Sequence, residues 1–234
     1  MELTTSYFRV FPASVTDRYE VRETRQAAAI LRATNSDLFD EIVAVLNDFE
    51  LVRSDFLTPG GQETKLARRF NNAFRHYGWR EARVDTEIEL RLRIMPYRNA
   101  GEKMVTETVT PVRNKGYQVD NFKGRVALDL EWNAKDGNLD RDIGAYRSLY
   151  DAGFIDVGVI VTRTQEELRN FSTEIRLQAG MQEKEARKLL GTTTTTNLEK
   201  LVPRMTRGDA GGCPLLAIAI SSRAYENSLA RKFS

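Results

Sequence analysis

The sequence predicts an α/β protein whose central mixed β-sheet is flanked by helices. Three observations carry this prediction. Two segments repeat apolar side chains at helical spacing, one segment alternates apolar and charged side chains, and a strand, a helix and a buried strand follow one another between residues 125 and 162. A strand, helix, strand order implies a right-handed crossover between parallel strands. Since a meander precedes this crossover, the sheet is expected to be mixed.

Composition limits the classes of protein that this chain can be. Its 234 residues are 41% hydrophobic and 29% charged, which is typical of one globular domain spanning 1–234. No apolar stretch reaches the ~18 residues that cross a bilayer, and no signal peptide begins the chain, so we expect a cytoplasmic protein without membrane contact. Cys213 is the only cysteine and His76 the only histidine. Any metal is therefore held by oxygen ligands, which favours magnesium, manganese or calcium.

Helical spacing marks two segments of the N-terminal part, which we expect to be a helical elaboration of the domain. In "SDLFDEIVAVLNDFELV" (36–52) the apolar residues fall at 38, 39, 42, 43, 45, 46 and 49. In "GGQETKLARRFNNAFRHYGW" (60–79) we expect Leu66, Phe70, Phe74 and Tyr77 to face inward, and Gly78 to end the helix.

A meander is expected next. "VDTEIELRLRI" (84–94) alternates strictly, so Ile88, Leu90, Leu92 and Ile94 share one face of a half-buried strand. We expect a second strand at "MVTETVTPV" (104–112), a turn at "RNKG" (113–116), a strand at "YQVD" (117–120), a short loop "NFKG" (121–124) and the strand "RVALDLEW" (125–132).

The remaining elements complete the sheet and its cover. "LDRDIGAYRSLYDAG" (139–153) is expected to be a helix that ends at Gly153, and "FIDVGVIVT" (154–162) a central strand covered on both faces. A long polar helix at roughly 165–190, a threonine loop, a short helix near 197–205 and the strand "PLLAIAIS" (214–221) follow.

The stretch "DNFKGRVALDLEW" (120–132) puts carboxylates where a strand should be buried. Alternation sends Val126 and Leu128 to one face and both Asp129 and Glu131 to the other. Two like charges ~6.6 Å apart along a strand repel each other. A divalent metal would neutralise them, with Asp120 as a third oxygen ligand from the end of the preceding strand. The alternative is a sheet face on which basic side chains pair with the acids.

The order of these elements and acids resembles the PD-(D/E)XK nuclease core. More closely, "GWREARVD", "VDNFKGRVALDLEW", "FIDVGVIV" and "TRGDAGGCPLLAIAI" resemble, in collinear order from about residue 38 to 220, the BglII/BstYI-like group of type II restriction endonucleases. The resemblance implies a homodimer that cuts a short palindrome in double-stranded DNA with Mg²⁺, for which Mn²⁺ is expected to substitute. It also implies a partner DNA methyltransferase of the same specificity.

The resemblance also assigns catalytic and metal-binding residues. Asp120 matches the family's first metal-binding aspartate and Asp129 its second acid. Glu131 stands where the superfamily has lysine and BglII-like enzymes have glutamine, so it would either bind a second metal or orient the attacking water. Val119 replaces the usual proline before Asp120. Glu63 is a possible extra catalytic carboxylate, with stabilisation of a helix N-terminus as its alternative.

A DNA-recognition segment is expected at about 190–210, around "GTTTTTNLEK" (191–200). Threonine hydroxyls can contact base edges, and Asn197 can pair bidentately with adenine. The alternative is a linker that ends in Thr196 or Asn197 as the cap of a helix. For the basic residues of the set, a solvated surface role is the alternative to a phosphate contact. The residues expected to bind DNA are Lys123, Asn133, Lys135, Thr194, Thr195, Asn197, Lys200, Arg204 and Arg207.

Two other functions remain open at the level of the sequence. A structure-selective PD-(D/E)XK nuclease, acting on junctions or in repair, would share the metal site. A non-catalytic DNA-binding protein could use the same fold. No phosphate-binding P-loop is present, since "TPGGQETK" lacks its spacing and its ending. For the homodimer, the helix that contains "LFDEIVAVL" and the long helix before the threonine loop are the expected interface elements.

Overall fold

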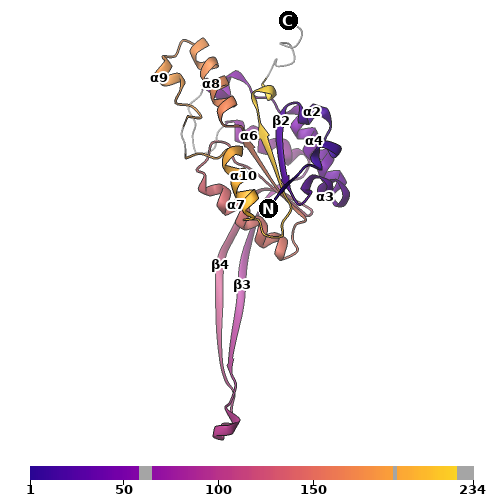
Figure 1. Ribbon diagram of the computed structural model, residues 1–234, viewed down its shortest axis with the longest axis vertical. Coiled ribbons are helices and arrows are strands. Elements are labelled where there is room, and N and C mark those ends of the chain that lie inside the picture. Colours follow the sequence, from indigo (N-terminus) through magenta and orange to yellow (C-terminus); the bar gives the residue numbers. More distant parts are fainter. Residues whose placement is uncertain (58–64, 192–193, 226–234) are drawn as a thin grey trace. The chain divides into compact units, whose positions relative to one another are not determined.

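The computed structural model describes residues 1–57, 65–191 and 194–225. The chain divides into two compact units: Met1–Glu81 together with Val119–Ser234, and Ala82–Gln118 (Figure 1). The strands form a seven-stranded sheet in the order β1-β2-β7-β6-β5-β4-β3. It contains parallel and antiparallel pairs and is flanked by helices, so the predicted fold class is confirmed.

Three parallel strands form the centre of the sheet in the larger unit. They are β5 (Val126–Leu130), β6 (Val157–Arg163) and β7 (Leu215–Ile220), and every residue in them is buried. β2 (Tyr19–Thr24) runs antiparallel to β7, and β1 (Leu3–Thr4) antiparallel to β2. The sequence analysis did not identify these two N-terminal strands. Since β2 covers the side of β7, the apolar β7 is an interior strand.

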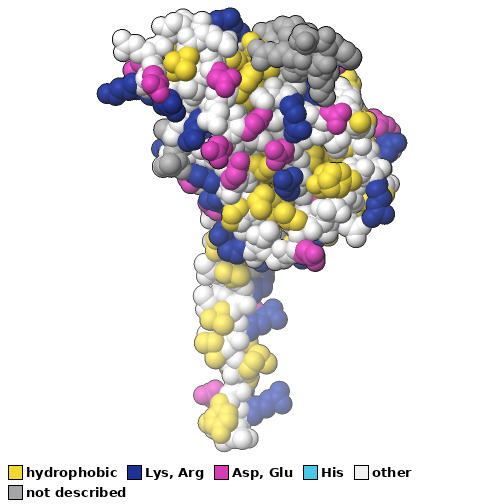
Figure 2. Space-filling view, turned by 45° about the horizontal axis from the view of Figure 1, so that its top comes forward, with side chains coloured by type: hydrophobic (Ala, Val, Ile, Leu, Met, Phe, Trp, Pro, Cys, Tyr) yellow, Lys and Arg dark blue, Asp and Glu magenta, His cyan; other side chains and the backbone are white. Residues whose placement is uncertain are grey.

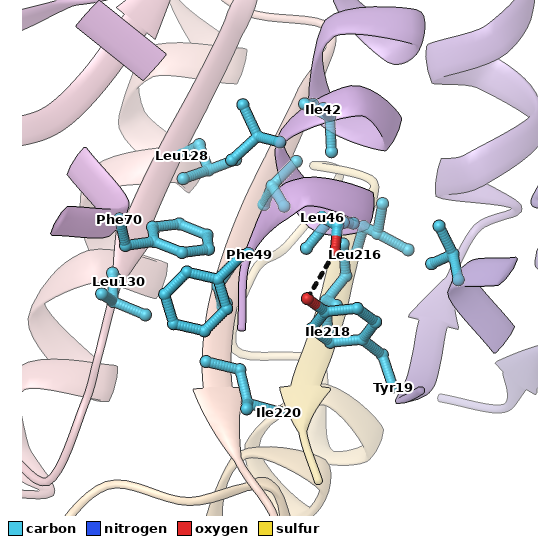
Figure 3. Packing of buried hydrophobic residues seen from close by; sticks show 14 of the residues in the cluster. Tyr19, Ile42, Leu46, Phe49, Phe70, Leu128, Leu130, Leu216, Ile218 and Ile220 are labelled. Atoms are coloured by element: carbon cyan, nitrogen blue, oxygen red, sulfur yellow. Dashed lines mark hydrogen bonds between the residues drawn. The ribbon is translucent and has the colours of Figure 1, made fainter. Parts of the chain in front are cut away.

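The N-terminal helices pack on one face of this sheet and build the main core. Phe49 and Phe70 lie against Leu128 and Leu130 of β5, and the hydroxyl of Tyr19 donates to the carbonyl of Leu46 (Figure 3). The N-terminal part of the chain is largely helical. Its helices are α1 (Tyr7–Val10), α2 (Ala13–Thr16), α3 (Ala27–Thr34), α4 (Ser36–Asp48), α5 (Arg53–Leu57) and α6 (Lys65–His76).

The end of α6 corrects one prediction. Leu66, Phe70 and Phe74 are buried as expected, but Tyr77 is exposed. The helix stops at His76, and Gly78 adopts a φ of 85°, so the chain turns away before Tyr77 can join the inward row.

The opposite face of the sheet is covered by α7 (Gly137–Asp151) and α10 (Leu198–Arg207), as Figure 1 shows. Both helices were predicted. The long polar helix expected at 165–190 is wrong: α8 (Glu166–Gln178) and α9 (Glu183–Ala186) are separate. Gly180, with a φ of 83°, follows α8 and ends it in the left-handed conformation that favours glycine.

The smaller unit holds most of two long strands, β3 (Arg80–Ile94) and β4 (Thr106–Lys123), with the short helix η1 (Arg98–Ala100) between them. The predicted half-burial of β3 is wrong, because its apolar row is 46–61% exposed. Figure 2 shows apolar side chains exposed along these two strands. The predicted turn at 113–116 is also wrong. Gly116 lies inside β4, where a Cβ would come within 1.4 Å of the Val84 carbonyl oxygen.

The two rare residues behave as ordinary packing and helix-end residues. Cys213 is free and fully buried, and His76 is the last residue of α6. Across the described residues, no helix combines the length and the apolar character needed to cross a membrane.

Candidate active site

Two carboxylates lie buried on one face of β5. Asp129 and Glu131 are each 5% exposed. The apolar residues of the same strand point into the core formed with the N-terminal helices, as the alternation of a strand requires. The acids therefore lie on the face that α7 covers. Carboxylates are rarely buried without a partner, so their contacts decide what they can do.

Asp129 is held by two donors. Its Oδ1 atom accepts the backbone N–H of Asp120 at 2.7 Å, and its Oδ2 atom accepts the hydroxyl of Tyr146 at 2.6 Å. The first contact follows from the pairing of β4 with β5, in which Asn121 lies opposite Leu128. The second depends on Gly158 of β6, where a Cβ would lie 2.3 Å from the Tyr146 ring. Strand pairing and a missing side chain thus fix one carboxylate orientation.

Helix α7 adds a fourth acid that the sequence analysis missed. Asp142 is 2% exposed, its buried Oδ2 atom accepts no amide, guanidinium or alcohol donor of the described residues, and its carboxyl shares a hydrogen bond with the Glu131 carboxyl. Arg141 lies 2.9 Å from Asp142 Oδ1 and 3.6 Å from Glu131 Oε1. Asn138 donates weakly to Glu131 Oε2 at 3.3 Å. One arginine therefore faces several acids, which leaves negative charge in excess.

The sequence did contain a signal for these α7 residues. Asn138, Asp142 and Tyr146 recur every four residues, so they lie on one face of the helix. That face meets the β5 carboxylates. A row of polar residues on the face of a helix that packs over a buried strand is the pattern that would have identified Asp142.

The proximity of these acids alters their protonation. Burial, and then the charges of Asp142 and Glu81, raise the pKa of Asp120, while a hydrogen bond with Asn71 partly offsets the rise. Burial and the charge of Asp142 raise the pKa of Asp129 to about 7. Burial and the neighbouring Asp142 also raise the pKa of Glu131. Several acids that disfavour one another's charge in one place are typical of functional sites.

Helix α6 reaches the site through polar contacts at the end of β4. Asn71 hydrogen-bonds the Asp120 carboxyl and accepts the side-chain amide of Asn121 at 2.9 Å. Arg75 donates to Asn121 Oδ1 at 2.6 Å and to the carbonyl of Asp120 at 2.7 Å. These contacts fix the backbone that carries Asp120. The sequence analysis had placed α6 in the core alone.

The donor set has the chemistry of a hard divalent cation. Carboxylate oxygens are the ligands that Mg²⁺ and Mn²⁺ prefer, and the buried Oδ2 atom of Asp142 lies beside an excess of negative charge. Within the described ranges, however, no three His, Cys, Asp or Glu side chains converge closely enough to hold an ion as they stand. The chemistry of the residues fits a metal, and a bound metal would have to draw the ligands together.

The expected recognition segment lies next to the end of β5. Thr195 forms a β-bridge with Lys135, and the carbonyl of Thr194 accepts the N–H of Asp136 at 2.9 Å. Asn133 has a φ of 55° and lies between this bridge and Glu131 in the chain. Thr194 and Lys135 are exposed. The structure thus brings residues 194–196 of the predicted threonine loop to the end of β5.

Asn197 has a structural role. It is 1% exposed, and its Oδ1 atom accepts the N–H of Lys200 as the N-cap of α10. Its amide donates to Gln165 Oε1 at 2.8 Å and to the carbonyl of Thr195 at 3.1 Å. The helix-cap alternative is confirmed. A base contact by Asn197 stays a prediction.

Four of the five basic residues predicted to bind DNA form ion pairs within the chain: Lys123, Lys200, Arg204 and Arg207. Lys123 is the last residue of β4, opposite Val126 of β5, and its Nζ atom lies 2.6 Å from Glu41 Oε1. Their phosphate contacts stay predictions. The pairs of α10 are Lys200 with Asp136 at 3.0 Å, Arg204 with Asp140 at 2.7 Å and Arg207 with Asp209 at 2.5 Å. Glu63 lies outside the described residues.

Comparison with known proteins identifies the family of this chain. A family model described as restriction endonuclease BglII/BglIII matches residues 19–220. The match runs from the first residue of β2 to the last residue of β7 and includes all four acids. A search among curated proteins found no match.

Proposed function

This chain belongs to the BglII/BglIII family of restriction endonucleases, and from that premise we propose that it is a type II enzyme. Membership makes it a nuclease that binds DNA. The proposal adds that it hydrolyses phosphodiester bonds at a short palindromic site in double-stranded DNA and depends on Mg²⁺. The observation that carries it is the group of acids buried at the end of β5 and under α7, inside the matched region.

In this proposal Asp120, Asp129 and Glu131 hold the metal ion. When bound, Mg²⁺ supplies a water of lowered pKa and screens the charge that develops on the phosphate. Asp129 offers its carboxylate in one fixed orientation, because the Asp120 N–H and the Tyr146 hydroxyl hold it. Glu131, on the same face of β5, orients the attacking water. Asn71 and Arg75 position Asp120 through the end of β4.

The proposed enzyme acts as a homodimer. A palindrome has two-fold symmetry, so two copies of a small domain would each supply one active site and one half-site. Because a sequence-specific nuclease endangers the cell's own DNA, we also propose a partner methyltransferase of the same specificity. Sedimentation of the protein, free and on cognate DNA, tests the dimer. Monomers of ~27 kDa under both conditions would rule it out.

One cleavage assay tests the proposed function. The protein is incubated with phage DNA in Mg²⁺, in Mn²⁺ and in chelator. We expect discrete bands with either metal and intact DNA in chelator. Cleavage confined to branched substrates would favour a structure-selective nuclease. Retardation of DNA on a gel without cutting in any metal would favour a non-catalytic DNA-binding protein.

A further inference from the structure

The backbone carbonyl of Glu131 accepts two threonine hydroxyls. Thr162 Oγ1 of β6 donates to it at 3.0 Å, and Thr196 Oγ1 donates at 2.9 Å. Both threonines are fully buried. The N–H of Glu131 donates to the carbonyl of Val161 at 2.8 Å. Two separate parts of the chain, β6 and the threonine loop, therefore fix the backbone of one proposed catalytic residue.

Thr196 makes further contacts with the residues that follow Glu131. Its hydroxyl accepts the N–H of Ala134 at 3.1 Å, and its own N–H donates to the carbonyl of Ala134 at 2.8 Å. A hydroxyl offers one donor and two acceptor sites, so the Thr196 side chain can serve both backbone groups at once. Thr196 thus closes the turn between Glu131 and Ala134.

The same pairing continues outward to the surface. Beyond Ala134, Lys135 bridges Thr195, and Asp136 donates to the carbonyl of Thr194. We call residues 134–136 and 194–196 the threonine clasp. Its outer end is exposed at Lys135 and Thr194, whereas its inner end is buried at Thr196. One short ladder therefore joins a surface that DNA can reach to the backbone of Glu131.

Arg163 contacts the threonine clasp from the end of β6 and restricts its movement. It is fully buried at the end of β6, and it donates to Thr195 Oγ1 at 3.1 Å and to Gln165 Oε1 at 2.9 Å. Burial lowers the pKa of Arg163 to about 10, so the guanidinium stays charged at neutral pH. A planar guanidinium that donates to fixed acceptors restricts their relative movement.

We propose that Thr196 is a specificity-determining positioning residue. This inference rests on the proposed function. When DNA fits the exposed end of the threonine clasp, the hydrogen bonds between residues 134–136 and 194–196 stay aligned. The Thr196 hydroxyl then holds the Glu131 carbonyl in the position that the reaction needs. DNA that fits poorly leaves Glu131 less well placed for the reaction. Thr162 donates to the same carbonyl from β6, and no hydrogen bond joins its hydroxyl to the described residues of the clasp.

The two threonines supply a matched test. Thr196→Val and Thr162→Val each remove one hydroxyl from the Glu131 carbonyl and keep a similar side-chain shape. Cleavage rates are measured in Mg²⁺ on the cognate site and on sites that differ by one base pair. For Thr196→Val we expect kcat on the cognate site to fall about tenfold, with KM nearly unchanged, and the ratio of cognate to near-cognate cleavage to fall similarly. For Thr162→Val we expect equal losses on all sites and an unchanged ratio.

Two further measurements distinguish the proposed role of Thr196 from a loss of activity caused by misfolding. Thr196→Ser keeps the hydroxyl, so it should restore the ratio. In the parent protein, hydrogen exchange at the Ala134 and Thr196 amides should slow on cognate DNA in Ca²⁺ and not on near-cognate DNA. This second measurement needs no variant.

Several results would overturn the inference. Equal changes in the ratio for both valine variants, a serine variant as poor as the valine variant, or identical exchange on both DNAs would each do so. A parent protein that cuts no DNA would instead overturn the proposed function itself. A parent that cuts specifically, with a Thr196→Val variant that keeps its ratio, would overturn the positioning role alone.

Discussion

The segments of β5 and β3 both show the side-chain alternation of a strand, but acids are buried at β5 and apolar side chains are exposed on β3. Asp129 of β5 and Glu131, the residue that follows the strand, are each only 5% exposed. On β3 the apolar side chains of Leu90 and Leu92 are 54% and 61% exposed. Alternation indicates that a segment is a strand. Whether its apolar or its polar face is covered depends on what packs against it, which the strand itself does not encode.

The difference lies in the cover of each strand. β5 has hydrogen-bonded neighbours on both sides, the N-terminal core on one face and α7 on the other. In the unit Ala82–Gln118 the apolar row of β3 faces no covering element. The buried acids at β5 therefore carry an unfavourable electrostatic free energy, whereas the exposed apolar side chains of β3 carry an unfavourable hydration free energy. The first is expected of a reacting site and the second of an open surface.

The largest effect is expected from Asp129 of β5 and Asp120 of the neighbouring β4. Asp129→Asn and Asp120→Asn should lose cleavage by several orders of magnitude, because each removes a charge that we propose binds the metal and keeps the side-chain shape. Both variants should bind DNA in chelator at least as tightly as the parent, because one charge that repels phosphate has gone. Cleavage, DNA affinity and thermal stability are measured on the same preparations.

The salt-bridge interpretation of these acids makes the opposite forecast. If Asp120 and Asp129 chiefly pair with buried basic side chains, their removal would leave a buried cation and cost about 3–5 kcal/mol of stability. Arg141 is not such a cation, because its side chain is 60% exposed and its ion pairs run to Glu131 and Asp142. Variants that melt early and lose DNA binding together with cleavage would assign Asp120 and Asp129 to holding the sheet. The metal site would then have to lie elsewhere.

The sequence was sufficient to identify the acids of β5 but not all that surrounds them. Alternation placed Asp129 and Glu131 on one face, and the turn after β4 brought Asp120 beside them. Asp142 was missed because α7 also carries the exposed acids Asp140 and Asp151, and only the packing of the helix on the sheet distinguishes the buried acid from them. Asn71 was missed because it reaches Asp120 from α6, more than forty residues earlier in the chain. Such contacts depend on tertiary packing, which no local pattern contains.

The fold was predicted where the patterns were long and covered on both sides. β6 and β7 were identified because their residues are almost all apolar. β2 was missed because half of its residues are charged, and its burial comes from the neighbouring β7. The turn at 113–116 was predicted from Gly116, whose real role is to let the Val84 backbone approach. A glycine in a sequence indicates an unusual backbone position, but not whether that position is a turn or a close approach of two strands.

The next largest effect is expected in the core behind the acids. Leu128 is fully buried on β5, opposite the face that carries Asp129. Leu128→Ala should cost about 2–5 kcal/mol of unfolding free energy, since it removes apolar contacts and leaves a cavity. Urea denaturation measures this loss. A cost below about 1 kcal/mol would mean that β5 is far less enclosed than its burial indicates.

A smaller effect should separate the ion pairs of the two regions. The Lys123 and Glu41 side chains are 31% and 19% exposed, whereas those of Arg93 and Glu107 are 61% and 35% exposed. Lys123→Met should cost up to about 1 kcal/mol of stability, and Arg93→Met close to nothing. If Lys123 instead contacts phosphate, its replacement would flatten the salt dependence of DNA binding and barely change stability. Denaturation and salt titration on both variants distinguish these results.

The smallest effect is expected at Leu92 of β3, the counterpart of Leu128. Its side chain is 61% exposed, so Leu92→Ala removes few contacts and should change the unfolding free energy by less than about 0.5 kcal/mol. Urea denaturation at two protein concentrations measures this change. A loss above about 2 kcal/mol would show that this apolar row is covered in solution. If that loss grew with protein concentration, the cover would be a second copy of the chain; if it did not, the cover would come from the same chain.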